Sequence, residues 1–223
     1  MFFMENILVI CAHPDDETLG LGGTLALHSK NKDKISILIL TDGESGRNIP
    51  HQKISSRKKQ AIEACKILGI DKINFLDFPD QKLDTFPLLE IAKKIEEEIN
   101  LLKPNIVYTH FWGDTNQDHQ QIFKATKIAA RPLPSSSVKK LICYEIQSST
   151  ELGTGSDVFS PNLFVNIEKT FQKKITAIKK YKHEIHPFPH PRSIDAITAK
   201  SQNIGSSVGV KFAEAFFIVF NIQ

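Results

Sequence analysis

The chain has 223 residues, of which 41% are hydrophobic and 24% charged, and its formal net charge at pH 7 is +3. This length is enough for one large α/β domain with a buried core, and the composition is ordinary for a soluble globular protein. The small net charge gives no support to nucleic-acid binding, and no apolar run approaches the ~20 residues of a membrane-spanning helix.

The first 149 residues alternate short apolar runs with longer helical patterns, which is typical of βαβ units around a mainly parallel sheet. The predicted strands are 6–11, 35–40, 73–78, 105–110 and 141–146. The predicted helices are 19–31, 57–69, 86–102 and 118–131. In the second helix we expect Ile62, Cys65 and Leu68 to form one apolar stripe, and Gly69 to end the helix.

The pattern is looser beyond Ser149. It predicts a strand at 162–167, a basic helix at 168–182, a proline-stiffened loop at 186–192, a helix at 193–203 and a closing strand at 213–220. Neither a repeat nor a linker divides the chain. We therefore expect a single domain over 1–223, with a core at 1–149 and a C-terminal elaboration at 150–223.

The cysteines and the N-terminus indicate a reducing compartment. Cys11, Cys65 and Cys143 are odd in number and lie in separate apolar stretches, so we expect buried, reduced thiols. The first apolar run has no basic segment before it and stops at His13 after seven residues, unlike a signal peptide. We expect a cytoplasmic protein.

Polar segments follow the first four predicted strands: AHPDDE, TDGESG, FPDQKLD and THFWGDTNQDH. In an open parallel sheet these loops all leave the carboxyl ends of the strands, where such folds bind ligands. We therefore expect the four segments to converge on one cleft.

The AHPDDE segment carries candidate metal ligands and a candidate base. His13 and Asp16 lie three positions apart around a turn stiffened by Pro14, so both side chains can reach one ion. Asp15 lies beside them and suits a general base for a water whose pKa the metal lowers. Glu17 can support the ligands from behind. The alternative is a plain strand-to-helix turn in which Asp15 or Asp16 caps the helix.

The GDTNQDH segment can complete the site. A catalytic zinc usually has three protein ligands and an open position, and His119 supplies the third. Asp114 or Asp118 can orient the other nitrogen of that ring. The alternative is an acidic turn in which Asp118 caps the next helix. The position after a strand, opposite HPDD, favours one divalent ion per chain, zinc or iron(II).

Together these segments resemble the PIG-L/LmbE-like N-acetylglucosaminyl deacetylases. The resemblance spans nearly the whole chain: AHPDDE at 12–17, TDGESG at 41–46, the helix at 57–69, PD at 79–80, the stretch 110–119 and GVKFAEAF at 209–216. It implies a Rossmann-like three-layer α/β fold and a metal-dependent N-deacetylase of a GlcNAc-like sugar, nucleotide-linked or glycan-linked. It also implies a homo-oligomer, a trimer or hexamer.

Position by position, the resemblance implies that the ligands are His13, Asp16 and His119, that Asp15 is the base, and that Arg57 and Asp80 hold the sugar. Two positions depart from the family pattern. Gln60 stands where Glu is frequent, and Asn116 stands where many members have a second histidine. An amide can stabilise an oxyanion but cannot deliver a proton at neutral pH. Either Asp15 returns its proton, or another group does: His110, His183, His186 or His190.

Several residues keep two interpretations. The predicted catalytic group comprises Asp15, Asn116 and Asp118, and the predicted substrate residues are Arg57, Asp80, Glu44 and His110. Arg57 is equally compatible with an ordinary charge at a helix start, and Glu44 with an ordinary surface loop. Asp80 is compatible with a structural role in a turn. Trp112 can stack on a sugar or pack in the core. Arg192 can reach the cleft from the C-terminal loop.

The sequence leaves two rivals to sugar deacetylation. One is an amidase acting on a thiol-conjugated amino sugar, which would use the same metal chemistry in a different pocket. The other is a non-catalytic metal-binding or nucleotide-binding α/β protein. Against the nucleotide, glycines 20, 22 and 23 fall inside the predicted helix and do not form a G-x-G-x-x-G turn at the strand end.

Overall fold

The computed structural model describes residues 4–47 and 54–222, and in these residues one seven-stranded sheet has the order β3-β2-β1-β4-β5-β7-β6. The strands are β1 (Asn6–Cys11), β2 (Lys34–Thr41), β3 (Lys72–Phe78), β4 (Ile106–His110), β5 (Lys140–Tyr144), β6 (Leu163–Asn166) and β7 (Ala213–Asn221). The first five pair in parallel, and β7 runs antiparallel to β5 and β6. The predicted Rossmann-like α/β fold is confirmed.

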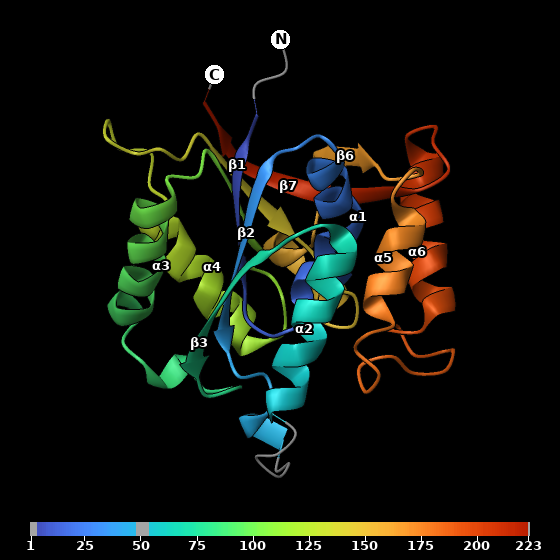
Figure 1. Cartoon of the computed structure of the whole chain (residues 1–223), viewed down its shortest axis with the longest axis horizontal. Helices are drawn as coiled ribbons and strands as arrows, with labels where there is room; N and C mark the ends of the chain where they lie inside the picture. Colours follow the sequence, from blue (N-terminus) through green and yellow to red (C-terminus); the bar gives the residue numbers. More distant parts are fainter. Residues whose placement is uncertain (1–3, 48–53, 223) are drawn as a thin grey trace.

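The sheet is the middle of three layers (Figure 1). On one face lie α3 (Leu88–Leu102) and α4 (Gln117–Ala129). On the other lie α1 (Asp16–Lys30), α2 (Ile54–Leu68), α5 (Phe171–Ile178) and α6 (Ile194–Ser207). Short 3-10 turns are η1 (Ser45–Arg47), η3 (Leu83–Thr85), η4 (Thr150–Leu152) and η5 (Gly155–Asp157).

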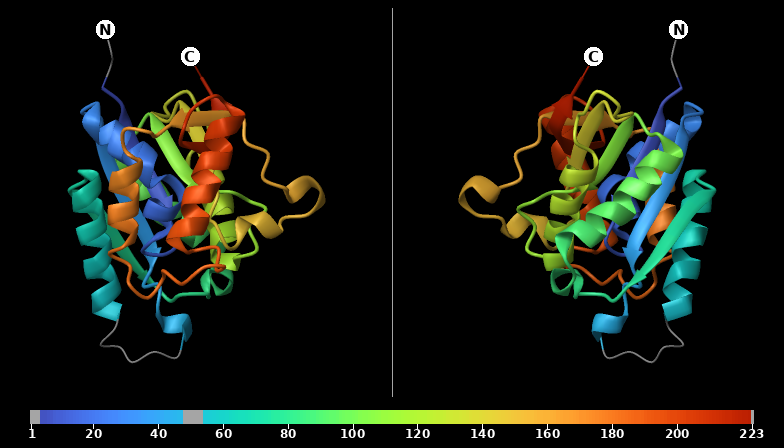
Figure 2. Two further views of the ribbon diagram at one scale, coloured as in Figure 1. Left: turned by 90° about the vertical axis from the view of Figure 1, so that its right-hand side faces the viewer. Right: turned by 90° about the vertical axis from the view of Figure 1, so that its left-hand side faces the viewer.

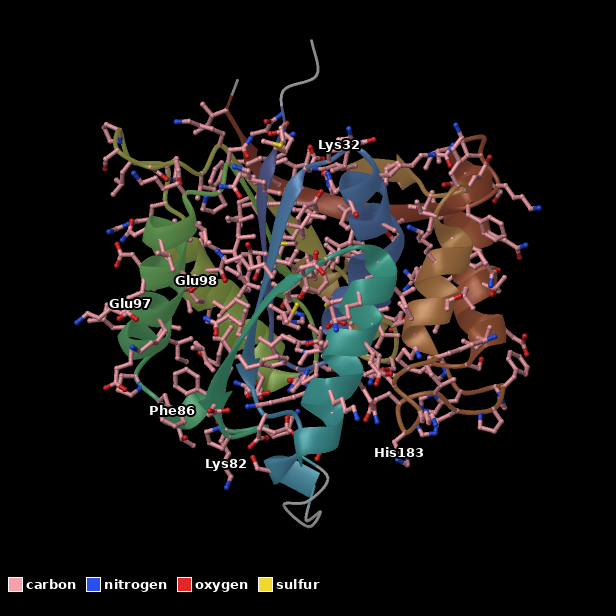
Figure 3. All side chains as sticks on the ribbon, viewed as in Figure 1. Lys32, Lys82, Phe86, Glu97, Glu98 and His183 are labelled. Atoms are coloured by element: carbon pink, nitrogen blue, oxygen red, sulfur yellow. The ribbon has the colours of Figure 1, made fainter. Side chains whose placement is uncertain are left out.

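Strand β1 shows why the sheet is buried on both sides. Ile7, Val9 and Cys11 belong to the apolar cluster under α1, α2 and α5, whereas Leu8 and Ile10 belong to the cluster under α3 and α4. Side chains alternate across a strand, so a continuous apolar run supplies both layers. On the outer face of α3, the charged side chain of Glu97 points away from the sheet (Figure 3).

The segment after residue 149 contributes to the same sheet through β6 and β7. Between β5 and β6 the chain extends away from the body of the molecule (Figure 2). Among residues 4–47 and 54–222, no helix is both long enough and apolar enough to cross a membrane.

Two predicted details are wrong. Ile62 is 38% exposed, because Ala61, Ala64, Cys65 and Leu68 are the apolar side chains that the described part of α2 buries in the core. The basic helix predicted at 168–182 is only Phe171–Ile178. The chain turns after Ile178, and Tyr181 leaves the helical path to enter the core, where its hydroxyl donates to Glu17 Oε1.

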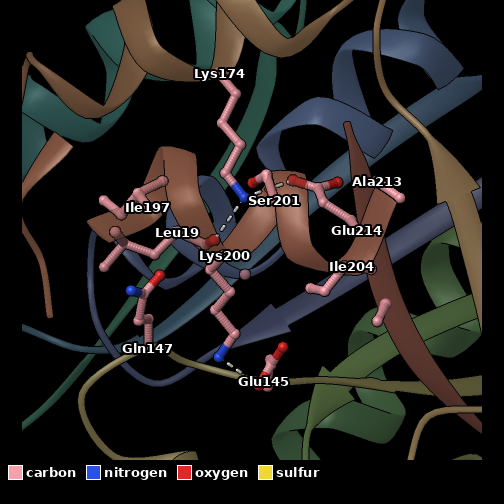
Figure 4. Close-up of a pocket in the computed structure, with 12 residues that line it drawn as sticks. Leu19, Glu145, Gln147, Lys174, Ile197, Lys200, Ser201, Ile204, Ala213 and Glu214 are labelled. Atoms are coloured by element: carbon pink, nitrogen blue, oxygen red, sulfur yellow. Dashed lines mark hydrogen bonds and ion pairs between the residues drawn. The ribbon is translucent and has the colours of Figure 1, made fainter. Parts of the chain in front are cut away.

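Helix α1 is kinked at Leu21, whose backbone leaves the helical region (φ −145°, ψ 22°). A buried ion pair spans the kink (Figure 4). Lys174 Nζ lies 2.6 Å from Glu214 Oε1 and donates to Leu19 O, before the kink. The carboxylate of Glu214 accepts from the N–H groups of Gly23 and Thr24, after it. The Lys174 cation thus contacts the carbonyl end of the first half of α1, and the Glu214 anion contacts the N–H end of the second half. The helix dipole favours a cation at a carbonyl end and an anion at an N–H end.

The glycines of α1 permit close packing. A Cβ on Gly20 would lie 2.5 Å from the Tyr144 ring, and one on Gly23 would lie 2.8 Å from Ile167. These glycines face protein side chains within a helix, which is not the arrangement of a phosphate-binding loop.

All three cysteines should resist thiol reagents in the native protein. Cys11, Cys65 and Cys143 are free and at most 1% exposed, and burial raises the pKa of each thiol above its ordinary value. Titration with a chromogenic disulfide should detect almost no thiol before denaturant is added and the full set afterwards. Rapid labelling of the folded chain would contradict the buried placement.

Candidate metal centre

Both halves of the site come from loops at the point where the strand order reverses. β1 and β4 are neighbours in the sheet, although β2 and β3 lie between them in sequence. The loop after β1 carries His13 to Asp16, and the loop after β4 leads to His119 in the first turn of α4. Open α/β sheets bind ligands at this switch point. Lys82 and His183 lie at the same edge of the molecule (Figure 3).

Three buried side chains present ligand atoms to one point. His13 Nδ1 lies 3.2 Å from His119 Nε2 and 3.4 Å from Asp16 Oδ2, and the latter two atoms are 3.5 Å apart. Bonds of about 2.1 Å in a tetrahedral zinc site place neighbouring ligand atoms about 3.4 Å apart. The triangle therefore fits three corners of such a site, and these residues are a group able to hold a metal ion.

Carboxylates contact the outer nitrogens of both imidazoles. His13 Nε2 lies 3.0 Å from Asp80 Oδ1 and 3.3 Å from Asp118 Oδ2. His119 Nδ1 lies 3.1 Å from Asp114 Oδ2. Histidines that ligate metals usually face a carboxylate in this way, which fixes the ring and its tautomer. Burial would raise the pKa of Asp114, but contacts with His119 and Thr150 hold it at about 2, so this carboxylate is charged.

The His13-Asp80-Asp118 group also has the geometry of a possible metal cluster. Asp118, however, already accepts from the N–H groups of Gln81 and Leu83 at 2.8 and 3.0 Å. Asp118 therefore links the β3 loop to His13, and this arrangement is more typical of a residue that supports a metal ligand than of a ligand to a second ion.

Asp15 lies beside the ligand triangle in a strained conformation. Its φ of 134° is unusual for a residue with a side chain. Although it occupies the N-cap position of α1, its carboxylate turns toward Arg57 and Arg192, at 3.0 and 3.1 Å. Burial raises the pKa of Asp15 above its ordinary value, although the two arginines act in the opposite direction. This placement favours a chemical role over the capping alternative.

Glu17 fixes the turn through both oxygens of its carboxylate. Its Oε2 accepts from the Asp15 N–H at 3.1 Å, and its Oε1 accepts from the hydroxyls of Thr18 and Tyr181. These contacts tie the turn to the C-terminal part of the chain.

Comparison with known proteins shows the family. The family model PIG-L (GlcNAc-PI de-N-acetylase) matches residues 8–130. The uncharacterized deacetylase YaiS of Escherichia coli K12 is 32% identical over 186 residues, which cover 80% of this chain and 91% of YaiS. The chain belongs to the PIG-L family.

Further relatives agree with this assignment. The diacetylchitobiose deacetylase of Thermococcus kodakarensis is 25% identical over 230 residues, covering 96% of this chain and 85% of the relative. The crystal structure of the conserved protein TT1542 from Thermus thermophilus has a TM-score of 0.80 at 28% identity, covering 99% of this chain and 97% of that one. The predictions of family membership and of an enzyme that acts on the N-acetyl amide of a sugar are confirmed.

Within this PIG-L site, His110 does not lie where a substrate residue should. It is fully buried, and its ring stacks on the ring of His119 with the two ring centroids 3.9 Å apart. Its Nε2 accepts a hydrogen bond from the Ala12 N–H at 2.9 Å. Burial and the neighbouring His119 lower its pKa to about 4. A neutral, enclosed ring is suited neither to binding a sugar nor to delivering a proton at neutral pH. We therefore correct its predicted role to support of His119.

Two residues of the β4 loop also have structural uses. Asn116 caps α4 through its side-chain oxygen, which accepts from the Asp118 N–H at 2.9 Å, so the alternative in which Asp118 caps this helix does not hold. Trp112 packs against Phe111, Phe123 and Phe217, which corresponds to the packing alternative.

The remaining predicted substrate residues are buried near the triangle. Arg57 donates to the carbonyl oxygens of Pro14 and Gly43 as well as facing Asp15. Asp80 contacts His13, and a Cβ on Gly46 would lie 3.3 Å from Asp80 Oδ2, which places the Glu44 loop beside the β3 loop. Their predicted contact with a sugar stays a prediction.

Sequence reasoning missed two neighbours of the site. Gln81 has a left-handed backbone (φ 57°), and its Nε2 lies 3.4 Å from His13 Nε2. In the sequence, only its position directly after Pro79 and Asp80 indicated that it could lie near the site. Glu184 is buried against both arginines that face Asp15. It stands in a histidine-rich loop, and nothing in the sequence pattern distinguishes it from a surface glutamate.

Proposed function

We propose that this chain hydrolyses the N-acetyl group of a GlcNAc-like amino sugar, using one divalent ion held by His13, Asp16 and His119. The observation that carries the proposal is the ligand triangle, drawn from two loops, with the buried carboxylate of Asp15 beside it. When bound there, a divalent ion lowers the pKa of a coordinated water and polarises the amide carbonyl.

The residues of the chain then move the protons. Asp15 accepts a proton from the attacking water, and the hydroxide oxygen bonds to the carbonyl carbon. As the C–N bond breaks, the protonated Asp15 returns its proton to the leaving amine, and the products are the free amino sugar and acetic acid, which ionises to acetate. Two observations support this dual use of Asp15: the side chain of Asn116 caps a helix, and His110 is enclosed.

We propose zinc as the ion, because two imidazoles and one carboxylate around an open position form a typical catalytic zinc set. The same ligands suit iron(II), which metal analysis can distinguish. Arg57, Asp80 and Glu44 are the proposed contacts of the sugar. The expected trimer or hexamer stays a prediction.

The test combines metal analysis with acetate release. Purified protein should contain about one zinc ion per chain, the number a single three-ligand site can hold. It should release acetate from at least one member of a panel of free, glycosidic and nucleotide-linked N-acetylglucosamine. A chelator should abolish release, and added zinc should restore it. Metal-free protein that binds nucleotide tightly, with no acetate formed from any sugar, would support the non-catalytic rival instead.

The panel also addresses the amidase rival. A thiol-conjugated N-acyl amino sugar should be included beside the simple N-acetyl sugars. Hydrolysis of that conjugate alone would keep the metal chemistry and change the substrate class.

A further inference from the structure

Asp15, Arg57, Glu184 and Arg192 form a closed ring of alternating charges, here called the charge ring. Arg57 Nη2 lies 3.0 Å from Asp15 Oδ1 and 3.6 Å from Glu184 Oε1. Arg192 Nη1 lies 3.1 Å from Asp15 Oδ2 and 3.2 Å from Glu184 Oε2. Each carboxylate therefore contacts both arginines, and each oxygen of Asp15 has its own guanidinium.

The two arginines are held differently. Arg57 is 3% exposed and is fixed by the carbonyls of Pro14 and Gly43, so it is part of the frame of the site. Arg192 is 17% exposed in its side chain. It lies in the loop between α5 and α6 (residues 179–193, here called the C-terminal loop), which is outside the residues 8–130 that match the family model. Its Nε donates to Ser148 Oγ at 2.9 Å.

Two residues that contact Arg192 have a strained backbone. Asp15 and Ser148 both have positive φ values, 134° and 94°. Such conformations are energetically unfavourable and persist where the surrounding structure imposes them, often at active sites. That two strained residues bind the same guanidinium indicates that Arg192 is held in a defined place for a purpose beyond surface solvation.

The C-terminal loop is itself anchored so that it can present these side chains. The Glu184 N–H donates to Tyr181 O at 3.0 Å, close to the buried Tyr181 side chain that contacts Glu17. The Arg192 N–H donates to His190 Nδ1, and the next residue, Ser193, caps α6 through its hydroxyl. The loop is thus fixed on both sides of the charge ring.

We propose that Glu184 and Arg192 are positioning residues for deacetylation, which with Arg57 fix the plane of the Asp15 carboxylate beside the metal ligands. This inference rests on the proposed function. A carboxylate oxygen has two acceptor sites, so each oxygen of Asp15 that accepts from an arginine keeps a second site for the proton of the water. Glu184 balances the charge of the two arginines, so that neither is left unpaired in a buried place.

The test is the substitution R192A in the full-length, metal-loaded protein. Because misplacement of a reacting group by about 1 Å can cost 100-fold in rate, we expect kcat to fall by up to about 100-fold with KM little changed. Guanidinium chloride, below its denaturing range, should restore part of the lost kcat of R192A and leave the wild type unaffected. R192K should retain less activity than wild type, because one ammonium group cannot make the several coplanar hydrogen bonds of a guanidinium group. E184Q should lower kcat in the same way.

R131A is the matched control, since Arg131 is an exposed arginine outside the ring, and its kcat should equal that of wild type. Bound metal and the midpoint of thermal unfolding are measured for every variant. The inference is overturned if R192A keeps wild-type kcat, if its loss follows loss of metal or of folded protein, or if guanidinium restores nothing. An inactive wild type would refute the proposed function and this inference with it, whereas an active wild type with an unaffected R192A would refute the inference alone.

Discussion

The substitution Asp15→Asn is expected to lower kcat by about 10²–10⁴-fold, the usual contribution of a general base, while the metal stays bound. The amide keeps the size of the carboxylate but cannot accept the proton of water. Asp15 stands beside the ligand triangle without belonging to it, so all three ligand atoms remain in place. Acetate release and metal content, measured on the same preparation, check this expectation.

An exposed aspartate provides the control for this experiment. Asp77 is 78% exposed in its side chain and pairs with Lys58 on the surface, so Asp77→Asn should leave both kcat and metal content unchanged. Activity of the Asp15 variant near that of wild type would remove Asp15 from the mechanism. Loss of metal together with activity would instead make Asp15 a ligand or a support of the ligands.

The ligand triangle could be predicted because it depends on rules that act along the chain. The apolar runs before His13 and before the β4 loop identify buried strands, and parallel strands bring their carboxyl ends to one edge. Once that edge is assigned, His13, Asp16 and His119 have few other places to point. The same reasoning placed the loop that contains Asp80 at this edge, because Asp80 comes two positions after the end of β3.

The predictions that failed are those that depend on where a single side chain points. His110 ends β4, and nothing in the sequence indicates that its ring stacks beneath His119 in the core. Tyr181 interrupts a helical pattern because its hydroxyl meets Glu17, more than 160 positions earlier. Glu184 and Arg192 reach the site through a proline-rich loop whose path no periodicity describes. Contacts of this kind are set by tertiary packing, which overrides local preference.

The largest expected effect on stability lies at the Lys174–Glu214 pair. The two side chains are only 5% and 4% exposed, and removal of one partner from such a pair typically costs about 3–5 kcal/mol because the other charge stays buried and unpaired. The substitution K174M keeps most of the aliphatic stem but leaves the Glu214 carboxylate without its cation. We expect the free energy of unfolding in urea to fall by about that amount, with little change in the m-value.

A double variant separates the charge pair from simple packing. In K174M/E214Q neither member of the pair carries a charge, and the glutamine oxygen can still accept from the N–H groups beyond the kink in α1, so the double variant should be more stable than K174M alone. The surface pair Lys94–Glu97, 49% and 64% exposed, is the control, and K94A should change the free energy of unfolding by less than about 1 kcal/mol. If K174M and K94A cost the same, the buried pair does not hold the kink. The first turn of α1 would then be fixed by the contact of Glu17 with Tyr181 and by the contacts of Asp16 with the histidines.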